Sequence, residues 1–578
     1  MSQDNTCSLL IRYLHSLINS GISLKAATLF LTIASFVCFT SLVAFLTWRI
    51  TRNSDVESDE GYFLAGRSLT GVFIAGSLLL TNLSTEQLVG LNGDSFKDGL
   101  SVMCWEVVAG ISLVILALVF LPRYLKSGIA TIPQFLETRY GRSVRSVTAA
   151  IFIVAYMMIL LPFVLFLGAN GLNGMLGLHV KFGVSELTMI WMLLVFIATL
   201  GGAYAIFGGL KAIAVSDTFN GAGLLVGGLM ITFFSLQLIA GSEGGFVGAL
   251  AKIEAADPDA FQSLGTADES THWPTLFTGV LLLNFFYWTT NQQIIQRTFG
   301  AKNLAEGQKG VLLAAFFKIL APLILVLPGI AAAYLVITVE DTQMIESVGM
   351  TDDGSWNTSR AYGALVARVL PNWLLGFFAA VVTGSILSTF NSVLNSAATL
   401  FSLDVYKQYI SPSATGSQVR RSGQICSFVV AVLAVIAAPF AFYGRDGVFS
   451  FFQGLNGVYF IPLAAVILVG LFNRWADGRS ALVTLIVGLF LMILGTFFAG
   501  GNEGWMASTF GSPFHYMGAV FVLLVSLQLV LSQIGFRRET AYEQIDVQAV
   551  DLTPWKPAPF VGAMLCLCAI SVYAYFAM

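Results

Sequence analysis

The sequence predicts an all-α polytopic membrane protein with about fourteen transmembrane helices, ten of them forming two inverted five-helix repeats. Three observations predict this class: a very apolar composition, a series of apolar runs long enough to cross a bilayer, and polar interruptions in two corresponding runs. Of 578 residues, 56% are hydrophobic and 11% are charged, and the mean hydropathy is +0.81. Soluble proteins are about a quarter charged, so the composition excludes a string of water-exposed domains, a disordered chain and a nucleic-acid-binding protein.

Apolar runs of about twenty residues mark the expected spans, because a helix of that length crosses the roughly 30 Å hydrocarbon core of a bilayer. The first run is too long for the apolar core of a secretory signal peptide, so we expect it to be a spanning helix. The fourteen spans are expected near residues 25–49, 70–96, 99–122, 145–177, 184–207, 213–240, 273–293, 309–338, 366–402, 421–443, 447–472, 479–499, 515–535 and 557–577.

The spans group into two blocks of five with additions at both ends. We expect an N-terminal extension with a peripheral helix (1–69), a first repeat (70–240), an extracellular loop (241–272), a second repeat (273–472) and three peripheral C-terminal helices (473–578). Because five is an odd number, the second block enters the membrane from the side opposite to the first.

Basic residues predict the orientation. If the N-terminus lies outside, 20 of the 29 Lys and Arg residues fall on the inward side and 8 on the outward side, while Lys318 lies inside a span. Cytoplasmic loops carry the excess of positive charge, so both termini are expected to face outward.

Cysteine and histidine indicate neither metal nor disulfide chemistry. The six cysteines are scattered, mostly within apolar runs, and the four histidines lie far apart in the sequence. No spacing matches a zinc site, so we interpret the cysteines as small buried apolar residues.

Three spans carry clusters of polar residues. The second changes from an apolar run to Thr81-Asn82-Leu83-Ser84-Thr85-Glu86-Gln87, the seventh contains Asn284 and the run Thr289 to Gln293, and the ninth carries polar residues from Ser385 to Ser396. A run of polar residues on a continuous helix would point in every direction, lipid included, at a cost of several kcal/mol for each unsatisfied group. Local unwinding, lined by other helices, resolves this conflict.

The two densest clusters, near residues 84 and 288, are about 200 positions apart, and each opens one five-span block. Interrupted helices at matching positions of two halves indicate a transporter with its binding site near the middle of the membrane.

Four ionisable residues lie within or at the edge of spans: Glu86, Glu106, Asp217 and Lys318. Such groups indicate a functional site by default, and the alternative is a buried pair that ties helices together. Asp217 could instead cap the following helix. Glu106 and Lys318, together with Gln87 and Asn284, supply the hydrogen-bonding groups that a sugar requires, and Trp105, Tyr287 and Trp288 are candidates for stacking on its ring.

These residues belong to longer motifs that occur in a fixed order: GYFLAGRSL, TNLSTEQLVGLNG, TIPQFLETRY, NFFYWTTNQQIIQRT followed by EGQKG, and LNSAATLFSLDVYKQYI. In combination they resemble the sodium/solute symporter family, and within it the sodium/sugar cotransporter branch, over residues 25 to 577. The resemblance implies a LeuT-type 5+5 inverted-repeat fold with unwound first helices in each repeat, a sodium ion as coupling ion, and a bacterial inner membrane location.

The resemblance also implies residue roles. Sodium would be bound by the carbonyls of Leu80, Leu83 and Ser385 and by the hydroxyls of Ser388 and Thr389. The substrate would be bound by Gln87, Glu106, Asn284 and Lys318, with Asn82, Ser84, Ser392 and Gln453 nearby, Tyr287 as an inner gate that stacks on the sugar, and Tyr156 lining the site. Asp217 would lie on the ion exit path.

The implied activity is sodium-coupled import of a monosaccharide of the galactose, glucose or mannose type by alternating access. One position departs from the bacterial sodium/galactose transporters of this branch: Ala109 stands where they carry a serine, so the identity of the sugar stays open. A polyol, an amino acid or a carboxylate is the alternative substrate, since Lys318 could pair with a carboxylate. A sensor without transport activity is disfavoured because no soluble signalling domain is appended, and the absence of nucleotide, hydrolase and zinc motifs disfavours an enzyme.

Overall fold

Helices account for nearly all regular structure in the part of the chain that the computed structural model describes, residues 24–54, 58–242, 244–267, 269–351, 354–443, 448–498 and 505–577. In those residues β-pairing is limited to isolated bridges. The expected all-α class is confirmed.

Ten helices in the described residues are long and apolar enough to cross a membrane, and a pair bent by 47°, Leu304–Leu320 with Pro322–Thr338, meets the same criteria when it is taken as one span. The other three expected spans consist of shorter helices. Two of them, near 70–96 and 273–293, are broken, and the third, near 184–207, is the first part of a long bent helix. Each of the fourteen expected spans therefore corresponds to a helix or to a broken helix.

The helices of the expected spans follow one another with short connections. In chain order they are α2 (Leu24–Thr51), α4 (Gly71–Asn82), α5 (Thr85–Asp98), α6 (Cys104–Ile115), α7 (Leu121–Lys126), α9 (Arg142–Ala155), α10 (Leu161–Leu176), α12 (Glu186–Ala240), α14 (Gly279–Thr289), α15 (Gln292–Phe299), α16 (Leu304–Leu320), α17 (Pro322–Leu325), α18 (Leu327–Ala333), α21 (Asn372–Thr399), α22 (Gly416–Phe442), α23 (Val448–Phe472), α24 (Gly478–Phe498), α26 (Pro513–Leu531) and α27 (Ala558–Phe576).

Short helical segments connect or extend these spans. Four are wide π-type turns: η3 (Leu116–Phe120), η4 (Tyr156–Leu160), η6 (Tyr334–Thr338) and η7 (Leu400–Ile410). The others are α3 (Asp59–Leu64), η1 (Ala65–Arg67), η2 (Gly99–Met103), α8 (Ile132–Tyr140), α11 (Leu178–Phe182), α13 (Gly245–Ala256), η5 (Trp273–Phe277), α19 (Thr342–Val348), α20 (Thr358–Val369) and α25 (Trp505–Phe510).

Helix α12 comprises two of the expected spans, near 184–207 and 213–240. Its backbone bends between them, at Gly209. That residue has φ 62° and ψ −180°, a conformation that favours glycine. The Tyr62 carbonyl oxygen lies 3.1 Å from the position that a β-carbon on Gly209 would occupy, so a side chain there would also be crowded.

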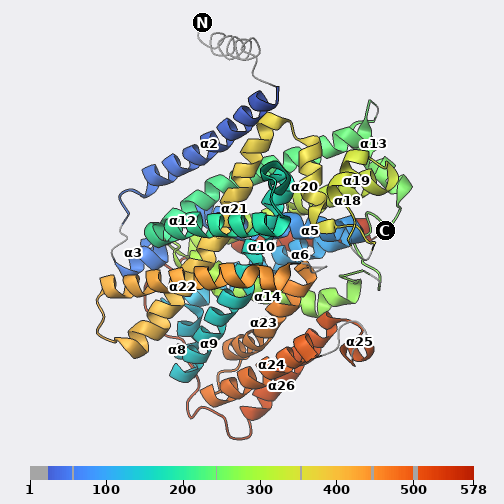
Figure 1. Cartoon of the computed structure of the whole chain (residues 1–578). Coiled ribbons are helices and arrows are strands. Elements are labelled where there is room, and N and C mark those ends of the chain that lie inside the picture. Colours follow the sequence, from blue (N-terminus) through green and yellow to red (C-terminus); the bar gives the residue numbers. More distant parts are fainter. Residues whose placement is uncertain are drawn as a thin grey trace.

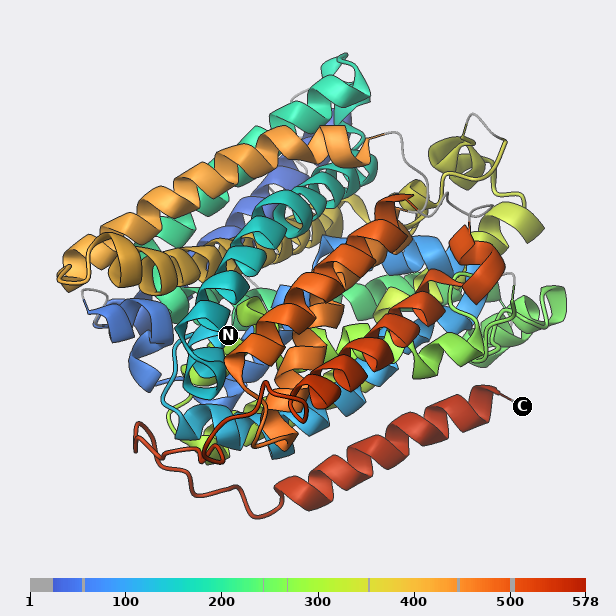
Figure 2. The same ribbon diagram turned by 90° about the horizontal axis from the view of Figure 1, so that it is seen from below.

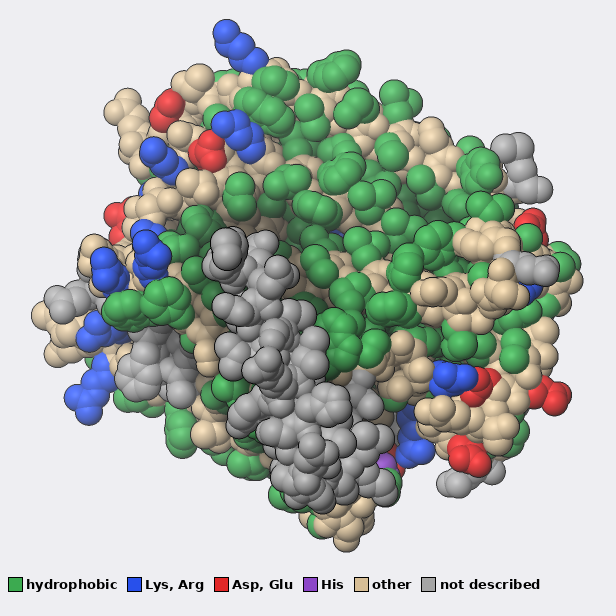
Figure 3. All heavy atoms as spheres, turned by 90° about the horizontal axis from the view of Figure 1, so that it is seen from above, with side chains coloured by type: hydrophobic (Ala, Val, Ile, Leu, Met, Phe, Trp, Pro, Cys, Tyr) green, Lys and Arg blue, Asp and Glu red, His purple; other side chains and the backbone are tan. Residues whose placement is uncertain are grey.

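The broken helices lie inside the bundle, and single helices cover its periphery (Figures 1 and 2). Helix α4 packs against α12, α16 and α21, and α5 packs against α10, α18 and α20. By contrast, only 11% of the most apolar stretch of α2 and 17% of that of α27 is buried, against 78% for the segment Thr85–Lys126. Figure 3 shows the surface that results, a broad apolar band with charged side chains at its ends, as a bilayer requires.

The cysteines only partly match the expectation of buried residues. Cys104 and Cys426 are buried, but Cys38 and Cys568 are exposed on the peripheral helices α2 and α27, where an apolar thiol can face lipid. Cys7 lies outside the described residues. In the described chain no group of three or more His, Cys, Asp or Glu residues could hold a metal ion.

Candidate solute and sodium site

The first predicted interruption separates α4 from α5. Helix α4 ends at Asn82 and α5 begins at Thr85, and the backbone of Ser84 is extended (φ −99°, ψ −172°). The N–H of Ser84 donates to the Asn82 carbonyl at 2.8 Å instead of continuing the helical pattern. The helix therefore breaks within the run from Thr81 to Gln87, where the density of polar side chains predicted unwinding.

The second interruption separates α14 from α15 at Thr290 and Asn291. The Tyr156 hydroxyl donates to Asn291 Oδ1 at 2.5 Å and accepts the N–H of Gln293 at 3.0 Å. One completely buried phenol thus satisfies the Asn291 side chain within the break and the backbone N–H of Gln293 at the start of α15. Both predicted breaks are confirmed.

The third polar cluster lies on a helix that stays continuous. α21 runs unbroken from Asn372 to Thr399, and its Ser, Thr and Asn side chains from Ser385 to Ser396 are buried. Packing of α21 against the end of α4 satisfies part of this polar surface. The Thr389 hydroxyl, for example, donates to the Thr81 carbonyl at 2.8 Å.

A pocket lies beside the first break and against α6, α14 and α23. Its lining is mixed amide, acid and aromatic: Asn82, Glu86, Gln87, Trp105, Glu106, Leu160, Leu283, Asn284, Tyr287, Trp288, Phe452, Gln453, Asn456 and Phe460. Six of the ten residues predicted to bind substrate are among them: Asn82, Gln87, Glu106, Asn284, Tyr287 and Gln453. The aromatic candidates Trp105 and Trp288 are there as well.

The other four predicted substrate residues lie behind or beyond this lining. Lys318 and Ser84 each bond to a lining residue, because the Lys318 ammonium contacts Glu106 and the Ser84 hydroxyl donates to the Glu86 carboxylate. Tyr156 is at the second break. Ser392 belongs to a separate polar network, in which its hydroxyl accepts from the Arg297 guanidinium.

Lys318 and Glu106 form an ion pair in the floor of the pocket. Both side chains are buried, and the Lys318 ammonium also donates to Asn82 Oδ1 and lies 5.3 Å from the centre of the Trp288 ring. A buried charge is tolerated when it is paired and hydrogen-bonded, and these contacts supply both conditions. The pair joins α6 to α16 and, through Asn82, to the broken α4. The same two residues therefore lie at the pocket and also tie helices together.

The pocket is nearly closed. Its free volume is about 40 Å³, space for about three water molecules at 10–15 Å³ each. At this volume a larger solute fits only if the lining side chains or helices move apart.

A second buried polar network surrounds Asp217. The Ser77 hydroxyl donates to Asp217 Oδ2 at 2.6 Å, Arg297 Nε donates to Ser77 Oγ at 2.9 Å, and the Arg297 guanidinium also donates to the Ser392 hydroxyl. Asp217 is completely buried within α12. The alternative that it caps a helix is therefore wrong.

The sequence model of the "Sodium:solute symporter family" matches residues 62–488 of this chain. The chain belongs to the sodium:solute symporter family. It is 40% identical over 546 residues to the symporter YidK of Escherichia coli (strain K12), covering 94% of this chain and 90% of YidK. It is 31% identical over 471 residues to the sodium/glucose cotransporter of Vibrio parahaemolyticus, covering 80% and 84%.

Among solved structures, the substrate-bound outward-open state of a Na⁺-coupled sialic acid symporter superposes with a TM-score of 0.71 at 19% identity, covering 89% of this chain and 99% of that one. That likeness establishes the fold. The predicted LeuT-type architecture and family are thus confirmed, and the protein is a sodium-coupled solute symporter of the membrane and not an enzyme.

The residues predicted to bind the symporter's sodium ion lie where α21 meets the end of α4. Leu80 is in the last turn of α4, Leu83 is in the break, and Thr389 bonds to this segment. The buried Ser388 hydroxyl faces the Asp217 carboxylate but makes no hydrogen bond of good geometry within the described chain. A buried hydroxyl with unused lone pairs, on the helix that packs against the end of α4, is compatible with a sodium ligand that uses oxygen.

Sequence reasoning missed several residues of these networks. Arg297 was assigned to an inward loop, whereas α15 continues the broken helix and buries it completely. The rule that flags intramembrane charges would have found it had the seventh span been extended by four residues. Glu86 was flagged as ionisable but given no role, and Asn456 was a detectable amide in an apolar run. No sequence signal marks Phe452 or Phe460.

Proposed function

We propose that this symporter imports a neutral monosaccharide together with sodium by alternating access. The observation that carries the proposal is the buried Lys318–Glu106 pair beneath a pocket lined with amides and aromatic rings. The relative from Vibrio parahaemolyticus, a sodium/glucose cotransporter, supports the sugar class.

The lining chemistry suits hydroxyl groups. Asn82, Gln87, Asn284 and Gln453 offer amides that both donate and accept hydrogen bonds. A site built from such groups selects strongly for a ligand that satisfies them, because a ligand without hydroxyls would leave buried polar groups unpaired. The rings of Tyr287 and Trp288 provide apolar faces in the same pocket.

The charge balance of the pocket favours a neutral solute over a carboxylate. Lys318 already contacts the Glu106 carboxylate, and Glu86 adds a second acid to the lining. An anionic substrate would meet two carboxylates and a lysine that is already paired, and desolvating it there would be costly. The amino acid and carboxylate alternatives therefore rank below the sugar.

Coupling between ion and sugar follows from their shared helix. The proposed sodium ligands Leu80 and Leu83 and the pocket residue Gln87 all belong to the segment around the first break. If both ligands stabilise one arrangement of this segment, each raises the affinity of the other by the same factor. A membrane potential of 100 mV contributes about 2.3 kcal/mol per charge and a tenfold sodium gradient about 1.4 kcal/mol, enough for several-hundred-fold accumulation.

The proposal includes the finer topology. Residues 70–240 and 273–472 would be the two inverted repeats, the basic loops would face the cytoplasm of a bacterial inner membrane, and both termini would face outward. Asp217, which is buried, bonds to Ser77 and faces the proposed ligand Ser388, would receive sodium on its way inward.

Counterflow in proteoliposomes tests the substrate class. Vesicles preloaded with one unlabelled monosaccharide at a time should exchange a labelled sugar in sodium but not in potassium. Uronic acids, which add a carboxylate to the same ring, should compete at least tenfold more weakly. Stronger competition by the acid than by the neutral sugar would contradict the proposal.

A further inference from the structure

Three buried polar side chains of the short helix α15 bond to three different parts of the protein. Gln292 bonds to the backbone at the start of α8. Gln293 Nε2 donates to the hydroxyl of the pocket residue Tyr287 at 3.2 Å. Arg297 Nε donates to Ser77 of α4 at 2.9 Å. Helix α15 therefore contacts α8, the solute pocket and the Asp217 network at the same time.

Gln292 makes two hydrogen bonds to the backbone at the start of α8. Its Oε1 accepts the N–H of Ile132 at 2.8 Å, and its Nε2 donates to the Ala130 carbonyl at 3.2 Å. Gln292 is also the first residue of α15 after the second break. The two bonds are therefore a direct link between the broken helix and α8.

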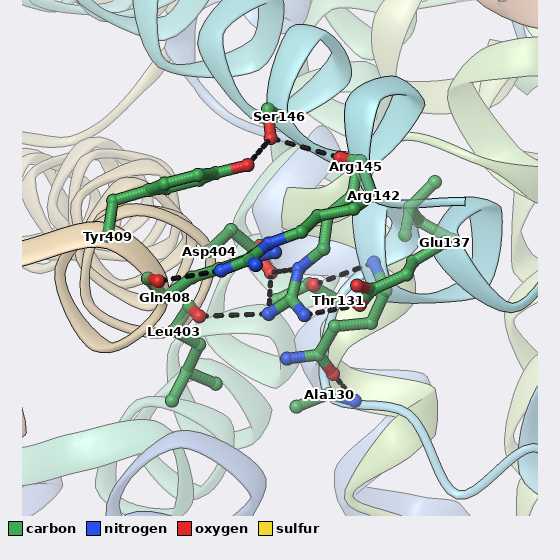
Figure 4. A network of polar contacts seen from close by, with 12 residues as sticks. Ala130, Thr131, Glu137, Arg142, Arg145, Ser146, Leu403, Asp404, Gln408 and Tyr409 are labelled. Atoms are coloured by element: carbon green, nitrogen blue, oxygen red, sulfur yellow. Dashed lines mark hydrogen bonds and ion pairs between the residues drawn. The ribbon is translucent and has the colours of Figure 1, made fainter. Parts of the chain in front are cut away.

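Other contacts fix the second half of α8 to the rest of the protein. Figure 4 shows Arg145 of α9 between Glu137 of α8 and Asp404 of η7, and its guanidinium bonds to both carboxylates. Arg139 of α8 is completely buried, and its Nε donates to the Gly470 carbonyl of α23 at 2.8 Å. These contacts do not involve α15, so α8 is anchored independently of it.

The last turn of α15 is linked to the proposed sodium site. Arg297 follows Gln292 by about one and a half turns, and its guanidinium donates to the hydroxyls of Ser77 on α4 and Ser392 on α21. The Ser392 hydroxyl in turn donates to the carbonyl of Ser388, a proposed sodium ligand, at 2.6 Å. Sodium bound where α4 meets α21 should therefore hold α15 in place.

We propose that Gln292 is a positioning residue that transmits occupation of the sodium site from α15 to α8. When sodium holds α4 against α21, Arg297 restrains α15, and the two Gln292 bonds restrain the start of α8. Without sodium, α15 loses this restraint, and the two bonds open more often. The proposal rests on the proposed place of the ion but not on the identity of the solute.

Hydrogen–deuterium exchange of the purified full chain, in sodium and in potassium, tests this coupling. Exchange reports local opening of the backbone, and it is measured at residues 81–88 for the ion site and at residues 134–140 for α8. In the wild type, sodium should slow exchange about tenfold at both segments, within the usual range of coupling between sites. In Gln292→Leu the slowing should remain at 81–88 and disappear at 134–140.

Gln308→Leu is the matched control. Gln308 is also buried, and its side chain also bonds to two backbone groups, the N–H of Trp555 at 2.8 Å and the Ala117 carbonyl at 3.2 Å. The variant removes the same kind of bonds away from α8 and α15, so it should keep both sodium effects. Ile132→Pro removes the N–H that Gln292 accepts, at the first position of α8, where a proline ring fits a helix. It should reproduce the effect of Gln292→Leu.

A sodium effect at 134–140 that is absent from the wild type, or equal in Gln292→Leu and the wild type, would overturn the proposal. Loss of the effect from both segments, or its loss in Gln308→Leu as well, would also overturn it, because the effect would then belong to general loosening of the fold. If Gln292→Leu does not fold, Ile132→Pro decides by the same criteria. Slowing at 134–140 but not at 81–88 in the wild type would support the coupling and contradict only the proposed place of the ion.

Discussion

The ammonium of Lys318 and the carboxylate of Glu106, 212 positions apart in the sequence, form a buried ion pair in the floor of the solute pocket. This pair sets the charge at the floor of the pocket, and it joins the scaffold helices to the broken α4 through Asn82. Four predictions follow from this pair and from the networks around it.

Removing one partner of the Lys318–Glu106 pair should lower the thermal stability much more than removing both partners. Lys318→Met leaves Glu106 as an unpaired buried acid, and such a loss costs about 3–5 kcal/mol. The double variant Lys318→Met/Glu106→Gln should recover most of the thermal stability but not sugar uptake. Thermal unfolding in detergent and uptake in proteoliposomes measure the two effects. Recovery of uptake in the double variant would show that the pair only ties helices together.

Thr389→Ala should weaken sodium binding. The hydroxyl bonds to the Thr81 carbonyl at the end of α4 and is a proposed sodium ligand, so its loss should raise the sodium concentration for half-maximal uptake about tenfold, equivalent to about 1.4 kcal/mol. Thr383→Ala is the matched control, because among the described residues that buried hydroxyl of the same helix bonds only to the Ala379 carbonyl within α21. A sodium dependence that is equal in both variants would remove Thr389 from the ion site.

Tyr156→Phe should loosen the second break. The hydroxyl serves both Asn291 and Gln293, and leaving buried polar groups unsatisfied costs about 1–3 kcal/mol. We expect a lower melting temperature and slower uptake with little change in sodium affinity. Tyr362→Phe is a close control, because the Tyr362 hydroxyl is buried without a hydrogen-bond partner in the described chain. Equal melting temperatures for the two variants would contradict this role.

Asp217→Asn, when it is combined with Arg297→Gln, should impair transport more than it impairs folding. Alone, the substitution leaves the buried Arg297 guanidinium without its nearby carboxylate, which is destabilising. The double variant Asp217→Asn/Arg297→Gln should regain stability, but its sodium-coupled uptake should stay at least tenfold below that of the wild type. Restored uptake in the double variant would limit the role of Asp217 to charge compensation.

The breaks could be predicted because polar side chains in a row cannot all avoid lipid. The run from Thr81 to Gln87 is polar on every side of a helix, and the structure interrupts the helix at Leu83 and Ser84. The same reasoning would have identified Arg297, but the limit of the seventh span was set too early, and the residue was counted in a loop. Span limits were therefore a weaker prediction than the breaks.

The sequence alone could not predict which distant residues contact each other. Glu106 and Lys318 were both flagged as intramembrane charges, yet nothing in their local patterns says that they touch. Likewise, Tyr156 reaches Asn291 across 135 positions, and it does so from a π-type turn that no composition signal announces. Such contacts depend on how the helices pack, which single-sequence periodicity does not specify.

The central claim is tested most directly by measuring the electric current that flows across the membrane when sugar is added. Proteoliposomes adsorbed to a solid-supported membrane should give an inward positive current when a neutral monosaccharide is added in sodium, and none when it is added in potassium. Lys318→Met should abolish the current. A current of equal size in potassium, or one elicited only by carboxylates, would contradict sodium-driven import of a neutral sugar.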